Sequence, residues 1–532
     1  MMVIEMLLLS RIFKNWKIVL FILLLIAIAL LAFWWLKIST PYGLGLINDS
    51  SAYVGGAVNM LGGYGYSRLS GGGEVKPITH FPPMFSIILA LIGLTGMDII
   101  RLARFVILLL YGLNAILVGL SLLVITRRYF VSILGAFLFA TSGIFLRVHS
   151  MLMSEPLFIT FCLMSSLFLA LFFYKQHRRW LFIAGLLAGF AVLTRYAGLA
   201  LFLTAVLTIV LLHRGLRSTL LDVSFFMLGA GPLPVAWSIR NRLLTGTTAN
   251  RQFLWHPPAW SKIDTGIFNF LDWLSPFNIL TWLQERKWIA YGFALLLVLA
   301  FLALMFYSWH RLFKHKSANG SMVGKSLWLF NQIYVVAYLS SILATMALFD
   351  ASTLFENRIL APAEVFFLIV ILALMTKWLE NKSLFLKSGM ILVLLIFAWF
   401  WAKDGKQAVK ILGKDGQGFA SLSWRNSRTI EYIRMLPVDK IIYTNKSTGV
   451  FLLTGRNAYA VQSRVDPVTQ IPRSTYVEEL DQLHNDVITR RAVLIFFGAD
   501  QQTEPEDRAW LEDLTSGLTI FEDFSDSVVY DR

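Results

Sequence analysis

A polar stretch directly after the first long apolar segment carries residues that could do chemistry. Ile47-Asn48-Asp49-Ser50-Ser51-Ala52-Tyr53 opens a connection, residues 39–100, that also contains His80-Phe81-Pro82-Pro83. An ionisable aspartate at the end of an apolar segment, in a connection far longer than a linker needs, is a candidate catalytic group. A structural role stays open, because Asn-Asp-Ser is also favourable chemistry for capping a short helix.

A second acid and two arginines occupy similar positions at the ends of other apolar segments. Ser154-Glu155-Pro156 precedes the fourth segment, Leu193-Thr194-Arg195 ends the fifth, and Glu356-Asn357-Arg358 precedes the tenth. Such a set suits a reaction in which a phosphate leaves while a hydroxyl or amine attacks, because cations hold the anion and a carboxylate takes the proton. Helix capping by Glu155 and snorkelling of lone arginines to lipid headgroups are the alternatives.

The composition requires that these residues sit on a membrane scaffold. Of the 532 residues, 57% are hydrophobic and only 15% are charged, which leaves too little polar surface for a soluble protein. The net charge of +15 would suit nucleic-acid binding, but the basic residues cluster between apolar segments, so membrane orientation explains them better and no nucleic-acid partner is expected. The single cysteine, Cys162, lies inside an apolar segment, so an internal disulfide is excluded.

Eleven apolar segments have the length that a bilayer demands. They cover about residues 17–38, 101–125, 131–147, 156–174, 179–194, 197–213, 219–238, 288–309, 327–349, 359–378 and 385–402. Residues 81–96 form a shorter run that opens with Pro-Pro, and we interpret them as an interfacial or re-entrant helix. The first segment is too long for a signal peptide and lacks a cleavage site, so it is expected to stay as a span.

Every second connection between these segments is basic, which predicts that the amino terminus is cytoplasmic. The basic connections include Arg11, Lys14 and Lys17, then Arg127 and Arg128, then Arg178 and Arg179. Residues 39–100, residues 239–287 and the tail therefore face outward, and the four tryptophans between 239 and 287 predict helices in the headgroup layer.

The tail changes composition sharply and predicts a separate domain. Apolar strands are expected at 440–444 and 492–497, helices at 427–436 and 476–484, and two closing strands between 518 and 530. The fold class is therefore an all-α polytopic membrane protein of about eleven transmembrane helices, residues 1–402, followed by an extracytoplasmic α/β domain, residues 403–532.

The order of these motifs resembles the membrane glycosyltransferases of the GT-C fold. The resemblance covers about residues 15–400 and rests on Ile47-Asn48-Asp49, His80-Phe81-Pro82-Pro83, Ser154-Glu155-Pro156, Leu193-Thr194-Arg195 and Arg358-Ile359-Leu360-Ala361-Pro362. The nearest branch contains the dolichyl-phosphate-mannose protein mannosyltransferases and the lipid A aminoarabinose transferases. The sequence departs from the usual pattern after Arg358, where no aromatic residue follows at once.

The resemblance implies a hexosyl- or pentosyltransferase that takes its sugar from a polyprenyl-phosphate donor. By resemblance, Asp49 is the general base of an inverting transfer, Glu155 is the second catalytic acid, and Arg195 and Arg358 bind the donor phosphate. His80, Tyr53 and His149 are substrate-binding candidates. The need for a divalent metal varies within the family and stays open here, with Asp49, Glu155, His80 and His149 as the candidate ligands.

The implied partners are an envelope lipid, glycan or protein acceptor and the bilayer of a bacterial-type inner membrane. A transporter or flippase of a lipid-linked sugar is the alternative from another class, and a non-catalytic scaffold is a third. Transporters usually place charged groups near the membrane midplane, whereas the candidate residues here gather at the outer ends of the spans.

Overall fold

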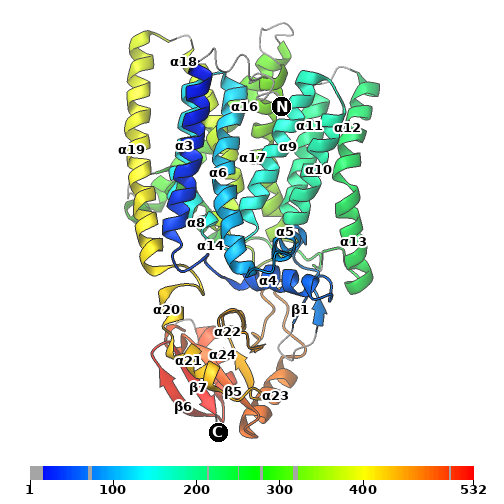
Figure 1. Ribbon diagram of the computed structural model, residues 1–532, viewed down its shortest axis with the longest axis vertical. Helices are drawn as coiled ribbons and strands as arrows, with labels where there is room; N and C mark the ends of the chain where they lie inside the picture. Colours follow the sequence, from blue (N-terminus) through cyan, green and yellow to red (C-terminus); the bar gives the residue numbers. More distant parts are fainter. Residues whose placement is uncertain are drawn as a thin grey trace.

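The chain folds into a long helical bundle with a smaller α/β part at one end (Figure 1). The computed structural model describes residues 16–69, 75–212, 215–249, 251–275, 280–314, 322–380, 382–502 and 505–531. The predicted cytoplasmic positions of Arg11 and Lys14 lie outside the described residues.

Seven described helices are long and apolar enough to cross a membrane, or up to nine if two bent pairs each count as one span. The seven are α3 (Trp16–Ser39), α6 (Ile99–Thr126), α9 (Glu155–Lys175), α16 (Lys287–Lys314), α17 (Met322–Leu348), α18 (Asn357–Leu379) and α19 (Leu384–Asp415). Two shorter apolar helices, α10 (Arg179–Thr194) and α11 (Leu199–Leu212), follow α9 and are joined by the short 3-10 helix η1 (Tyr196–Gly198). Each of the eleven predicted segments therefore has a helix at its position.

Two segments predicted as single spans are bent. Helices α7 (Tyr129–Thr141) and α8 (Gly143–His149) meet at 60°, because Ser142 leaves the helical conformation and its hydroxyl accepts the Phe145 N–H at 3.3 Å to start a new helix. Helices α12 (Leu216–Ala230) and α13 (Pro232–Thr245) meet at 51°, at the glycine that precedes Pro232. Proline lacks the N–H that would continue the first helix.

The long first connection lies across the end of the bundle that faces the tail. It contains α4 (Asn48–Leu61), the antiparallel strands β1 (Ser67–Leu69) and β2 (Val75–Pro77), and α5 (Met84–Gly93). Helix α5 has ten residues, about 15 Å of helix, which is half of the ~30 Å needed to span a bilayer. Helix α5 alone is therefore too short to cross a bilayer, which is consistent with the interpretation of residues 81–96 as an interfacial or re-entrant helix. The second long connection, residues 239–287, which the sequence predicts to face outward, forms α14 (Trp260–Leu274) and α15 (Leu280–Glu285).

The tail is a mixed five-stranded sheet with the strand order β4-β3-β5-β7-β6. Its strands are β3 (Ile441–Thr444), β4 (Tyr459–Ala460), β5 (Ala492–Phe497), β6 (Thr519–Phe524) and β7 (Ser527–Asp531), and its helices are α20 (Leu422–Arg425), α21 (Arg428–Met435), α22 (Ser447–Thr454), α23 (Tyr476–Ile488) and α24 (Pro505–Thr515). Every residue of β5 is buried, because apolar clusters cover both faces of the sheet. The predicted α/β fold of the tail is confirmed, although α19 continues past residue 402, so the boundary between the parts stays a prediction.

The backbone joins the tail to the bundle at two places. The N–H of Phe419 donates to the Leu46 carbonyl at 2.8 Å, and the N–H of Ala351 donates to the Val468 carbonyl at 2.9 Å. Gly418 allows the first contact, because its φ is +56° and an added Cβ would lie 2.1 Å from the Leu46 oxygen. The tail therefore lies against the same end of the bundle as α4.

Candidate active site

The beginning of α4 is fixed to the segment that precedes α9. The Gly45 N–H donates to the Ser150 carbonyl at 2.7 Å, and the Leu152 N–H donates back to the Gly45 carbonyl at 2.9 Å. The Ser50 hydroxyl donates to the Leu152 carbonyl at 3.0 Å and also accepts the Ile47 N–H at 3.0 Å. These bonds bring Asp49, on the first turn of α4, to the segment that carries Glu155.

Asp49 forms an ion pair with Arg358 at the start of α18. The distance from Arg358 Nη1 to Asp49 Oδ2 is 2.9 Å, although the two residues are 309 positions apart in the chain. Glu356 Oε2 accepts from Arg358 Nε at 2.7 Å, so this guanidinium has two carboxylate partners. The Asp49 and Arg358 side chains are 28% and 24% exposed, and the pair is therefore open to ligands.

Glu155 and Arg195 form a second pair with a different environment. Arg195 Nη1 lies 2.6 Å from Glu155 Oε1, and the Glu155 side chain is only 1% exposed. Neither Glu155 oxygen has a well-directed hydrogen bond within the described part of the chain. The contact is therefore an ion pair without the directional hydrogen bonds that a carboxylate usually accepts, and Glu155 keeps acceptor capacity.

Tyr53 and Ser154 lie beside the Glu155–Arg195 pair. The Tyr53 hydroxyl lies 3.0 Å from Ser154 Oγ, which also accepts from Arg195 Nη1 at 3.4 Å. Burial raises the pKa of Tyr53 above its ordinary value; Arg195 opposes this rise, while Asp49 and Glu155 add to it. The hydroxyl of Tyr53 thus stays protonated and feels charges from both pairs. The structure brings Asp49, Glu155, Arg195 and Arg358 together at one end of the bundle.

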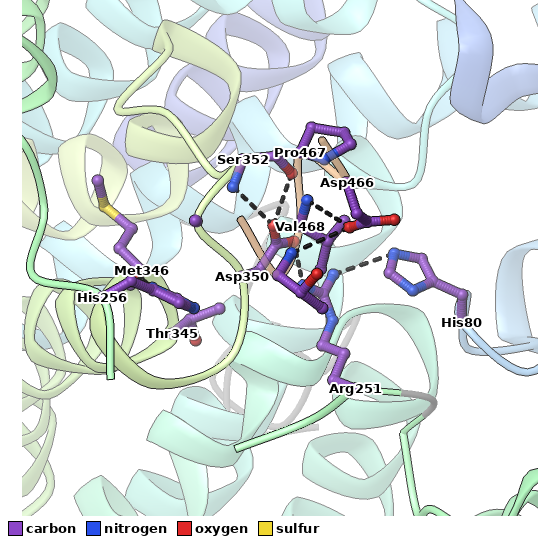
Figure 2. Close-up of polar contacts among 12 residues, drawn as sticks. His80, Arg251, His256, Thr345, Met346, Asp350, Ser352, Asp466, Pro467 and Val468 are labelled. Carbon is purple, nitrogen blue, oxygen red and sulfur yellow. Dashed lines mark hydrogen bonds and ion pairs between the residues drawn. The ribbon is translucent and has the colours of Figure 1, made fainter. Parts of the chain in front are cut away.

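His80 lies in a neighbouring cluster, which Figure 2 shows. Its Nε2 lies 3.0 Å from Arg251 Nη2, and Arg251 Nη1 forms an ion pair with Asp350. Asp350 also accepts the Ser352 N–H at 2.9 Å and the Ser352 hydroxyl at 2.6 Å. Burial, then the charge of Arg251, lower the pKa of His80 to about 4, so the ring is neutral at neutral pH and accepts from the guanidinium.

His149 occupies a different place from His80. It is fully buried in α8, where Nδ1 lies 2.7 Å from the Phe145 carbonyl and Nε2 lies 3.2 Å from Asn114 Nδ2. Both ring nitrogens therefore have protein partners. No group of three or more His, Cys, Asp or Glu side chains that could hold a metal ion is found in the described ranges.

Three polar residues of interest were not predicted from the sequence. Arg251 and Asp350 satisfy the same criterion as the predicted residues, since Arg251 lies in a long connection between apolar helices and Asp350 lies two residues after the end of α17. Glu364, inside α18, is 1% exposed, and neither of its oxygens has a hydrogen-bond partner among the described residues. An acid within an apolar span was the signal that could have found it.

Comparisons with known proteins agree with this architecture. Residues 80–237 match the family model of dolichyl-phosphate-mannose-protein mannosyltransferase. The chain superposes on the Archaeoglobus fulgidus oligosaccharyltransferase tethered with an acceptor peptide, with a TM-score of 0.57, 11% identity and coverage of 98% of this chain and 74% of that one. No curated protein matches the chain.

Two further solved structures are similar. AglB from Archaeoglobus fulgidus, in complex with an inhibitory peptide and a dolichol-phosphate, superposes with a TM-score of 0.55 at 13% identity. The match covers 94% of this chain and 72% of the AglB chain. ArnT from Cupriavidus metallidurans in the apo state has a TM-score of 0.51 at 14% identity, covering 96% of this chain and 97% of its own. The chain is thus an integral membrane protein with the fold of the GT-C glycosyltransferases, and the resemblance predicted from its sequence motifs is confirmed.

Proposed function

We propose that this chain moves a sugar from a polyprenyl-phosphate donor to a hydroxyl or amine of an envelope lipid, glycan or protein, with inversion at the sugar. The reaction takes place at the outer face of a bacterial-type inner membrane. The observation that supports the proposal most is the meeting of two acids and two arginines, from four separate elements, at the end of the bundle that faces the tail.

Arg195 and Arg358 are the proposed clamps for the donor phosphate. A guanidinium offers a planar fork of N–H donors that matches phosphate oxygens, and its charge stabilises the negative charge of the leaving group. Arg358 keeps Glu356 as a partner when a substrate separates it from Asp49. The phosphate would thus replace the Asp49 carboxylate at Arg358, while the Glu356 carboxylate still orients the guanidinium.

Asp49 is the proposed general base. Its partly exposed carboxylate takes the proton of the acceptor hydroxyl or amine as that atom attacks the anomeric carbon. The bond between the anomeric carbon and the phosphate oxygen breaks, and the lipid phosphate leaves with the electron pair. A single displacement of this kind inverts the anomeric centre.

Glu155, Tyr53 and Ser154 are proposed to position Arg195 for this step. Glu155 is too buried to meet a substrate without rearrangement, but it lies against the guanidinium and compensates its charge. Tyr53 is buried as well and packs edge-to-face on Phe81 and Phe85, which fixes its hydroxyl against Ser154. His80 lies closer to the tail contact and is proposed to orient Arg251.

The candidate metal ligands do not form one donor set. Asp49 and Glu155 each meet an arginine, while His80 and His149 bond to Arg251, Asn114 and the Phe145 carbonyl. A divalent cation beside Asp49 or Glu155 would also lie beside a guanidinium, which is unfavourable. No step of the proposed reaction is therefore assigned to a metal.

Glu364 bears on the alternative of a transporter, because a buried acid inside a span is typical of ion-coupled carriers. It lies six residues after Arg358 on α18, about 9 Å along the helix axis, and is therefore closer to the middle of the helix than to its first residue. The variant Glu364→Gln distinguishes the two functions. If the chain is a glycosyltransferase, the variant should still transfer sugar. If the chain is a proton-coupled flippase, the variant should lose transport.

The test of the proposal is Asp49→Asn in the full chain, reconstituted in nanodiscs with a radiolabelled polyprenyl-phosphate sugar and an envelope extract. Loss of the base should lower transfer by a factor on the order of 10² to 10⁴. The matched control is Glu285→Gln, which removes the carboxylate of the exposed Arg286–Glu285 pair and should keep transfer within about threefold, since exposed ion pairs contribute little. Full transfer by correctly inserted Asp49→Asn protein would rule Asp49 out as the base.

A further inference from the structure

A polar cleft of about 560 Å³ lies between the first outer connection and the tail. Ser51 and Gly55 of α4, together with Arg68 and Lys76 of the β1–β2 hairpin, form its wall on the membrane side. Strand β4 and helices α22 and α23 of the tail form the opposite wall. The cleft exists only because the tail lies against α4.

This cleft is separate from the site that contains Asp49. An α-helix turns by about 100° per residue, so Asp49 and Tyr53 share one face of α4, while Ser51 and Gly55 lie on the opposite face. Tyr53 faces Ser154, whereas Ser51 and Gly55 face the tail. A ligand in the cleft is thus separated from the proposed base by the ~10 Å width of a helix, and only an extended molecule could reach both.

The tail wall carries the groups that recognise sugars. Tyr459 stacks on Tyr443, with ring centroids 5.3 Å apart and planes at 25°. Tyrosines combine an apolar ring that packs on the C–H face of a sugar with a polar hydroxyl. The side-chain amides of Asn457, Gln462 and Gln482 also line the cleft, and an amide both donates to and accepts from sugar hydroxyls.

The membrane-side wall adds positive charge. Arg68 is exposed, and its guanidinium has no hydrogen bond or ion pair among the described residues. Lys76 lies beside it in the hairpin, and Glu479 is the acid that lines the opposite wall. The hairpin therefore favours a ligand with carboxylate or phosphate groups.

The geometry is less suited to a peptide. Peptides commonly bind to a sheet edge by adding a strand, and β4 is the edge strand that borders the cleft. Strand β4 has only two residues, however, and the carbonyl of Ala460 already accepts from Gln462 Nε2 at 3.4 Å. The aromatic rings, amides and basic groups of the cleft suit recognition of a glycan by side chains, whereas its short edge strand does not suit strand addition.

We propose that this cleft binds an anionic glycan of several sugar units, as the distal part of an extended acceptor. The assignment rests on the proposed function, because it places the reactive end of the acceptor near Asp49 and the remainder on the far side of α4. The cleft thus selects acceptors by their length and charge, although it lies apart from the site of sugar transfer.

Gly55 provides a way to close the cleft without touching the Asp49 face. A Cβ added to Gly55 meets only the Arg68 Cβ, at 3.9 Å, so Gly55→Phe projects into the cleft. Gly55→Ala is the matched control, since it adds one methyl group and leaves the cleft open. The neighbouring Gly56 is unsuitable, because its Cβ would lie 2.5 Å from Tyr66.

The experiment uses the full chain in biotinylated nanodiscs on a printed array of neutral and acidic oligosaccharides of one to eight units, with extended peptides on the same surface. The expected result is binding to acidic oligosaccharides of three or more units, at least tenfold weaker in Gly55→Phe and unchanged in Gly55→Ala. Tyr459→Ala should weaken binding by a similar factor, and Tyr459→Phe should keep most of it. Binding of peptides alone, binding of no glycan, or equal binding by Gly55→Phe would overturn the proposal.

The array separates a failure of this inference from a failure of the proposed function. Asp49→Asn should bind the same glycans as the wild type, because its change lies on the other face of α4. If the variant binds glycans and also transfers sugar, the catalytic assignment fails while the cleft stands. If transfer depends on Asp49 and no glycan binds, the reverse conclusion holds.

Discussion

The two acid–arginine pairs of the site contain the same residue types but differ in their exposure to solvent. The Asp49 side chain is 28% exposed and shares Arg358 with Glu356, whereas the Glu155 side chain is 1% exposed and lies against Arg195. Partly exposed pairs exchange partners at low cost, while breaking a buried pair leaves an uncompensated charge. The difference supports the proposal that Asp49 does the chemistry and that Glu155 positions Arg195.

Removing the guanidinium that Asp49 and Glu356 share should have the largest effect on use of the lipid donor. Arg358→Ala is expected to lower kcat/KM for the lipid donor by a factor on the order of 10² to 10³, as removal of one donor to a developing oxyanion does. Arg358→Lys should recover part of the loss, because lysine keeps the charge but not the fork. Steady-state kinetics with varied donor check this, and an unchanged donor dependence would remove Arg358 from the phosphate site.

Glu155→Gln should show that the buried pair contributes more to the stability of the protein than the exposed pair does. The substitution leaves Arg195 without its carboxylate in a buried site, which should cost about 3 kcal/mol of unfolding free energy. Asp49→Asn, at the exposed pair, should cost about 1 kcal/mol or less. Thermal unfolding of both variants in the same detergent measures the difference. Equal shifts of Tm would show that the two pairs do not differ in the way their exposure suggests.

The smallest expected effect concerns His80, whose ring accepts from Arg251 in the cluster next to the two acid–arginine pairs. Its pKa is lowered to about 4 by burial and by Arg251, from an ordinary ~6.5. The unfolded chain therefore takes up the proton at higher pH, so the contribution of His80 to stability is complete above about pH 6.5 and is lost as the pH falls toward 4.

The variant His80→Gln keeps an acceptor for Arg251 but cannot titrate. Its Tm should fall by a few degrees less than that of the wild type between pH 7 and pH 4.5. Parallel Tm curves for the two proteins would show that the His80 ring does not titrate in the way its burial predicts.

The sequence predicted the elements of the membrane part because hydropathy and charge act locally. Each predicted span has a helix, and the short run at 81–96 forms α5, which has only ten residues. The bends at Ser142 and Gly231 were not predicted. A single residue that breaks a helix leaves the average hydropathy of its segment almost unchanged, so an apolar window cannot reveal it.

The sequence predicted which residues belong to the candidate site, but it did not predict which acid pairs with which arginine. Asp49 was expected near the arginines, yet nothing in the sequence indicates that it meets Arg358, 309 residues away, and that Arg195 meets Glu155. Such pairings depend on how helices pack and carry no periodic signal. The pairing of Arg251 with Asp350 and the cleft behind α4 were missed for the same reason, since each arises where distant segments come together.

The most direct test of the central claim is a cryo-EM structure of the full chain with undecaprenyl phosphate in nanodiscs. The account predicts density for one phosphate between the guanidinium groups of Arg195 and Arg358, with Asp49 released from Arg358 and facing the sugar position, while Glu155 stays against Arg195. A phosphate bound elsewhere, with both acid–arginine pairs intact, would contradict it.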